Sequence, residues 1–150
     1  MSGRDERGSG LIELVWLTLI LIVPLIYVVL TVFSVQRGAL ATGAAARAAG
    51  RAYALAPSDQ AGAARARAAA LQALSDQGQT SDGWSLEVSC TPHPQACHEG
   101  GSVITVVVHT QVGLPLLPTL LGVGGGAIRL DATSTVPVGE YQAVTGVAPG

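Results

Sequence analysis

The chain has 150 residues, enough for one domain in addition to a membrane segment. Only 12% of the residues are charged, against about 25% in an ordinary soluble domain, while 49% are hydrophobic. The formal net charge is −2 and the sequence has no stripe of basic residues, so a nucleic-acid partner is not expected.

Residues 1–8 are polar and of mixed charge, and we expect them to form a cytoplasmic leader. Residues 14–33 contain no charged side chain. This uncharged run has about the length that a helix needs to cross roughly 30 Å of hydrocarbon. We therefore predict a transmembrane helix over residues 9–35. Arg4 and Arg7 precede it and favour an N-terminus in the cytoplasm of a single-pass membrane protein.

A cleavable signal peptide is the alternative interpretation of this segment. Its apolar run is longer than the core of such peptides, which spans about 7–15 residues. The only nearby small-x-small cleavage pattern is Ala39-Leu-Ala41, and it follows Arg37 rather than an apolar end. The sequence therefore favours a retained helix.

Residues 36–77 form an Ala-rich region, and Ala has the highest helix propensity. We expect the membrane helix to continue through this region as one long rod to about Ala56, because Pro57 ends it. Ser58 and Asp59 then provide an N-cap and a first-turn acid for a second Ala-rich helix.

The Ala-rich region has two interpretations. Its helices are either a plain spacer or a dedicated packing surface, because small residues such as Gly38, Gly43 and Gly50 let helices approach closely. The sequence alone leaves both interpretations open.

After a polar linker over residues 78–83, the hydrophobic pattern changes from a helical period to the alternation of strands. The predicted strands cover residues 84–90, 102–112 and 127–136. Three strands are near the minimum for a stable sheet, so we expect the Ala-rich helix to cover one face. The predicted fold class is α+β, with an extracytoplasmic β-rich head over residues 84–138 and a flexible tail over residues 139–150.

Two cysteines, Cys90 and Cys97, flank a turn-rich tip between the first two predicted strands. On the far side of a membrane, a pair at this spacing most simply forms a disulfide that closes a hairpin loop. His93 and His98 permit a rival metal site, but the spacing matches no standard zinc pattern and Pro flanks His93 on both sides. The disulfide is therefore the favoured prediction, with no bound metal.

The sequence contains no recognisable catalytic set, so we expect neither an enzyme nor a cofactor. His109 is alone on a predicted strand, and the Gly-rich residues 122–126 lack the Lys-Ser/Thr of a phosphate-binding loop. Residues 114–123 are the most apolar stretch of the head. They either cap its small core or form a patch for a partner or the membrane surface.

One acidic residue, Glu13, stands at the entrance to the apolar run. A charge there is costly and usually functional, although a carboxylate at the interface can also simply reach water. Glu13 is the fifth residue after Gly8. A short charged leader that ends in Gly, followed by an apolar helix with Glu at its fifth position, is typical of prepilins.

The chain resembles the TadE-like pseudopilins of the Tad/Flp pilus assembly system, in their actinobacterial form. The segments that carry the resemblance are Gly-Ser-Gly-Leu-Ile-Glu-Leu-Val-Trp at residues 8–16, Pro24, Val-Gln-Arg-Gly-Ala at residues 35–39, and Ala-Ala-Ala-Arg-Ala-Ala-Gly-Arg at residues 44–51. The β-rich remainder is compatible with such proteins.

The resemblance implies cleavage by a prepilin peptidase between Gly8 and Ser9. Cleavage frees an α-amino group at Ser9, and Glu13 of a neighbouring helix then neutralises it and sets the register between subunits. The implied role is assembly of a pilus or secretion filament, with other pilins and platform proteins as partners. The alternative is a single-pass membrane protein with a small binding head and no pilus role.

Overall fold

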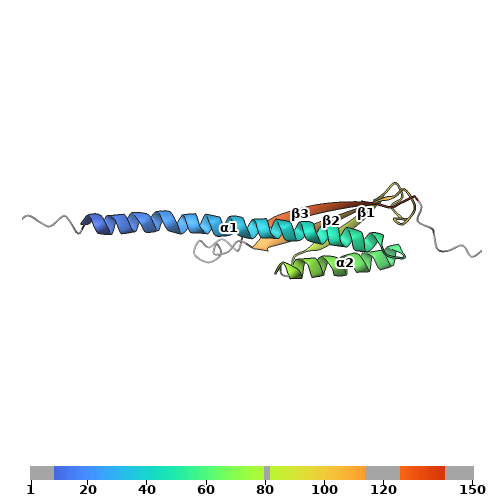
Figure 1. Cartoon of the computed structure of the whole chain (residues 1–150), viewed down its shortest axis with the longest axis horizontal. Helices are drawn as coiled ribbons and strands as arrows, with labels where there is room; N and C mark the ends of the chain where they lie inside the picture. Colours follow the sequence, from blue (N-terminus) through green and yellow to red (C-terminus); the bar gives the residue numbers. More distant parts are fainter. Residues whose placement is uncertain (1–8, 80–81, 114–125, 141–150) are drawn as a thin grey trace, which may run out of the picture.

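The computed structural model describes residues 9–79, 82–113 and 126–140. It contains two helices followed by three strands, which confirms the predicted α+β class. Figure 1 shows one long helix that extends well beyond a compact end, where the second helix and the sheet lie alongside it. Both helices lie on the same side of the sheet.

The first helix, α1, runs without interruption from Ser9 to Ala54 and has 46 residues. At 1.5 Å per residue, its length is roughly 70 Å. Its first half is apolar and its second half is rich in Ala, and the helix continues through Pro24 and ends shortly before Pro57. The prediction of one long rod is therefore confirmed.

The second helix, α2, spans Asp59–Asp76 and begins at the predicted cap. The Ser58 hydroxyl accepts a hydrogen bond from the backbone N–H of Ala61 at 3.3 Å. The buried residues of α2 recur every fourth position and form one stripe that faces the core: Gly62, Ala66, Ala70 and Leu74.

The strands β1 (Ser85–Thr91), β2 (Val103–Gly113) and β3 (Ala127–Pro137) form one antiparallel sheet in the order β1-β2-β3. Residues on β2 alternate between a buried and a more exposed face, and β2 is the central strand of the sheet. The buried face of β2 carries Ile104, Val106 and Val108, which are fully buried.

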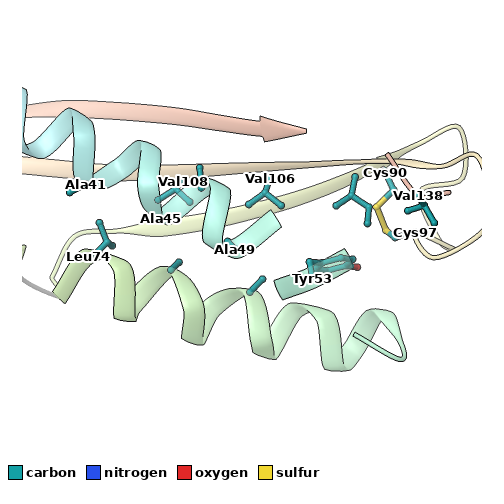
Figure 2. Packing of buried hydrophobic residues seen from close by; sticks show 14 residues of the cluster. Ala41, Ala45, Ala49, Tyr53, Leu74, Cys90, Cys97, Val106, Val108 and Val138 are labelled. Carbon is teal, nitrogen blue, oxygen red and sulfur yellow. A yellow bond between two sulfur atoms is a disulfide. The ribbon is translucent and has the colours of Figure 1, made fainter. Parts of the chain in front are cut away.

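The Ala-rich half of α1 is a packing surface rather than a spacer. It contacts α2 as well as β2 and β3. Ala41, Ala45 and Ala49 lie along its buried side and are 0% exposed, and Figure 2 shows them in the core with Val106 and Val108. The expectation that the Ala-rich helix covers the sheet is therefore confirmed.

Small residues allow α1 to lie very close to the strands. A β-carbon at Gly38 would overlap Cγ2 of Val112 on β2 and would lie 3.0 Å from Cδ1 of Leu130 on β3. A β-carbon at Gly50 would lie 3.1 Å from Cγ2 of Val136. Gly38 and Gly50 therefore let α1 approach the sheet, instead of the helix–helix approach that the sequence suggested, and a β-carbon at Gly43 would meet only the Arg47 side chain of α1 itself.

Candidate functional site

The apolar half of α1 is the most unusual surface of the molecule. Its side chains are exposed along the whole length, with Ile12, Trp16 and Phe33 each 63% exposed. By length and composition, α1 is the one helix of the described residues that is long and apolar enough to cross a membrane. The cost of exposing so much apolar area to water is large, which makes a bilayer or other helices the natural surroundings.

The Ser and Thr hydroxyl groups of this apolar half are satisfied inside the helix itself, whereas the buried Tyr27 hydroxyl has no hydrogen-bond partner among the described residues. Thr18, Thr31 and Ser34 each donate a hydrogen bond to the carbonyl oxygen four residues earlier, at 2.7, 2.9 and 3.0 Å. Such internal bonds remove the cost of placing a hydroxyl in a medium without water.

Glu13 lies in the first two turns of α1, on an exposed part of the helix. No salt bridge to it occurs among the described residues. Ser9 is the first residue of α1 and precedes Glu13 by four positions, so the two residues are on the same helix face, one turn apart. Gly8 lies outside the described residues.

The predicted disulfide is confirmed. Cys90 at the end of β1 is bonded to Cys97, and their Cα atoms are 5.3 Å apart. Both sulfur atoms are therefore unavailable as thiolate ligands. No group of three or more His, Cys, Asp or Glu residues that could hold a metal ion occurs among the described residues.

The residue after the disulfide, His98, joins three separate parts of the chain. Its Nδ1 lies 2.5 Å from Oδ1 of Asp59 at the start of α2, and its Nε2 lies 3.1 Å from the carbonyl oxygen of Tyr53 near the end of α1. Its ring also stacks on the Tyr53 ring, with centroids 5.4 Å apart. The second carboxylate oxygen of Asp59 accepts a hydrogen bond from the Cys97 backbone N–H at 3.3 Å.

This arrangement, which we call the His98 clasp and define as Tyr53, Asp59, Cys97 and His98, was not predicted from the sequence. Both ring nitrogens of His98 face oxygen atoms, one of the Asp59 carboxylate and one of the Tyr53 carbonyl group. Burial raises the pKa of the Tyr53 hydroxyl, and the neighbouring Asp59 carboxylate raises it further. The clasp holds the disulfide loop against the junction of the two helices, so its evident role is structural.

The outer face of the sheet carries a second polar cluster around His109. Its Nδ1 lies 2.6 Å from Oδ1 of Asp131 on β3, and its Nε2 lies 3.9 Å from Oε1 of Glu87 on β1. Ser85 is the register partner of His109 on β1, so Ser85, His109 and Asp131 form one row across the three strands. A pocket of about 370 Å³ lies over this row.

The row brings together a Ser, a His and an Asp that lie far apart in the sequence. Only the strand register makes them neighbours, and no local motif indicates it. The described hydrogen bonds of His109 go to Asp131 and not to Ser85, so the row lacks the serine–histidine bond of an activated nucleophile. The other stretch considered from the sequence, residues 114–123, lies outside the described residues.

Comparison with known protein families, with curated proteins and with solved structures finds no match to this chain. The grounds for assigning a function are therefore the sequence motif at the start of α1 and the way in which α1 combines an exposed apolar half with a half that packs in the head.

Proposed function

We propose that the protein is a TadE-like minor pilin or pseudopilin that takes part in assembling a Tad/Flp-type pilus or secretion filament. The observation that carries this proposal is the construction of α1. One continuous helix has an exposed apolar half and a buried Ala-rich half that is part of the core of the head. Such a helix connects a membrane-embedded surface rigidly to an outer head.

The start of α1 supports the same proposal. Ser9 begins the helix, and Glu13 is one turn further on the same face. If a prepilin peptidase removes residues 1–8, the new α-amino group lies at a helix N-terminus in apolar surroundings. A carboxylate from an adjacent copy is a suitable partner for this amine, because two charges in a medium of low dielectric constant must be paired.

The proposed topology places residues 1–8 in the cytoplasm and the head outside the cytoplasmic membrane. The Cys90–Cys97 disulfide supports this orientation, because structural disulfides persist in oxidising compartments. The proposed partners are the prepilin peptidase, other pilins or pseudopilins, and the platform proteins of the pilus system. The proposal includes no cofactor and no enzymatic activity.

Mass spectrometry of the mature N-terminus, on protein purified from the native host, tests the processing step. We expect the chain to begin at Ser9. An intact Met1 would instead favour a single-pass membrane protein with a binding head and no pilus role, and a start near Thr42 would indicate a cleaved signal peptide.

The role of Glu13 is tested with the variants Glu13→Ala and Glu13→Asp and with the control Thr18→Ala, which removes a polar group that is satisfied within α1. We expect Glu13→Ala to remain membrane-inserted in an alkaline extraction but to assemble poorly into filaments. Glu13→Asp should retain part of the assembly, and Thr18→Ala should assemble normally. Normal assembly of Glu13→Ala would show that this carboxylate does not set the register.

A further inference from the structure

The sheet has two free edges within the described part of the chain. Strand order β1-β2-β3 leaves one side of β1 and one side of β3 without a strand partner among these residues. An unpaired edge presents a row of backbone N–H and C=O groups that another strand can join.

Neither edge strand carries a bulge, a lysine or an interior proline, although β1 has the charged residue Glu87 and β3 has Arg129 and Asp131. The pairs between β2 and β3 run without a bulge from Val103 opposite Pro137 to Gly113 opposite Ala127. Within the two edge strands there is no Lys, and Pro occurs only at the last position of β3. Protected edges in natural proteins usually have bulges, lysines or interior prolines, so both edges are open to pairing.

The directions of the strands limit how two copies can pair. Both β1 and β3 are antiparallel to β2, so β1 and β3 run parallel to each other. Two copies that α1 anchors in the same orientation present β3 of one to β1 of the next as parallel strands. All helices then remain on the same side of the combined sheet, and the contact repeats from copy to copy, as a head-to-tail interface does.

Side chains at the two edges fit this arrangement. Arg129 of β3 is level with Gln111 of β2, and Asp82 lies three residues before the start of β1, near the same end of the sheet. Arg129 and Asp82 are both exposed, and no salt bridge within the described residues involves either of them. Their opposite charges lie near the same end of the sheet and so attract each other across the joint.

The buried face of the sheet also favours a continuation. The inward side chains at the edges, such as Leu86 on β1 and Leu130 on β3, are only half-buried, whereas those of β2 are fully buried. A strand added at either edge would cover this apolar surface, which is favourable by about 25 cal/mol per Å².

We propose that heads of adjacent copies join edge to edge, with β3 of one copy parallel to β1 of the next, so that a second copy of this chain is the partner of each edge. This inference rests on the part of the proposed function in which α1 anchors all copies in one orientation. It adds a head-to-head contact to the helix-mediated contact.

Cysteine cross-linking of the full chain in membranes of the native host tests the proposal. Glu87 and Thr133 are exposed, lie on the outer face and are both level with Val107, so Glu87→Cys/Thr133→Cys is the first pair. Glu87→Cys/Thr135→Cys allows for a shift of two residues. The controls are each single variant and Thr105→Cys, which lies on the same face of the central strand.

Under mild oxidation, we expect at least one double variant to give disulfide-linked dimers and higher oligomers, at least fivefold above each single variant. Arg129→Glu in that background should reduce the yield, and Asp82→Arg should restore it. Cross-linking no greater than that of Thr105→Cys would overturn the proposal. Equal cross-linking by Thr133→Cys alone would also overturn it, because it would indicate symmetric pairing of β3 edges.

The mature N-terminus of the same samples separates this inference from the proposed function. A Ser9 start without cross-linking would reject edge pairing and leave the pilin-like function standing. Cross-linked chains with an intact Met1 would support edge pairing and count against the pilin-like function. Intact Cys90–Cys97 bonds in every variant, determined by peptide mapping, would show that the heads are folded.

Discussion

The hydroxyl oxygens of Thr42 and Thr110 lie 2.6 Å apart, buried between α1 and β2. The Thr42 hydroxyl also lies 2.8 Å from the carbonyl oxygen of Gly38, to which it donates a hydrogen bond. Both bonds are satisfied if Thr110 donates to Thr42. This pair is a polar contact between helix and sheet in largely apolar surroundings, and it favours one axial position of α1 over others, because a slip of one turn would separate the two hydroxyls.

The stability effects of removing the two hydroxyls of this pair should be coupled. Thr42→Val or Thr110→Val should lower the free energy of unfolding by about 1–3 kcal/mol, since each leaves a buried hydroxyl with fewer partners. The double variant should lose less than the sum of the two single losses. Chemical denaturation of the full chain in detergent, followed by circular dichroism, measures this double-mutant cycle. Additive losses would show that the two hydroxyls are not coupled.

Two glycines of α1 should respond to the same substitution in opposite directions. Gly38→Ala should destabilise the head by about 1–3 kcal/mol, because its β-carbon would overlap Val112 in a close-packed contact. Gly43→Ala should stabilise it by up to about 1 kcal/mol, because the new methyl group meets only the Arg47 side chain and Ala is the better helix former. Unfolding midpoints of the two variants, compared with the parent, test the prediction. A stabilising Gly38→Ala would indicate that the sheet is not closely packed on α1.

The His98 clasp should depend on Asp59. Asp59→Ala removes the acceptor for both the His98 ring and the Cys97 N–H, so we expect a loss of about 1–3 kcal/mol in the free energy of unfolding. The matched control is Asp76→Ala at the exposed far end of α2, which should change stability by no more than about 0.5 kcal/mol. Equal losses for the two variants would contradict a specific role of Asp59.

Stability should fall in alkaline solution through Tyr53. Burial raises the pKa of its hydroxyl above the ordinary value of 10.0, so the folded protein holds this proton more tightly than the unfolded chain does. The contribution of Tyr53 is therefore fully present below about pH 10 and is lost as the pH rises through the folded-state pKa. Unfolding midpoints measured between pH 8 and pH 11 should decline more steeply for the parent than for Tyr53→Phe. Parallel curves would contradict the prediction.

Much of the fold was predictable because its signals are local. The apolar length of α1, the Ser58 cap of α2 and the β-branched run of β2 are each encoded within a few turns or residues. The Cys90–Cys97 pair was predictable for the same reason, since a short hairpin loop brings its two ends together.

The clusters around His98 and His109 were not predictable in this way. His98 meets Asp59, 39 positions away, and His109 meets Asp131, 22 positions away. A shift of one residue in either strand pairing would place His109 and its partners on opposite faces. Such contacts depend on register between distant segments, for which a single sequence contains no local signal.

Local sequence patterns were sufficient to predict a membrane-length apolar helix, an Ala-rich continuation, a disulfide loop and three strands. The contacts between these segments show in addition that the Ala-rich half of α1 is the packing surface of the head. They also show that Gly38 and Gly50 face strands and that the two edge strands of the sheet run in the same direction. The physical reason is that propensity and periodicity act within one segment, whereas close packing and strand register are properties of segments in contact.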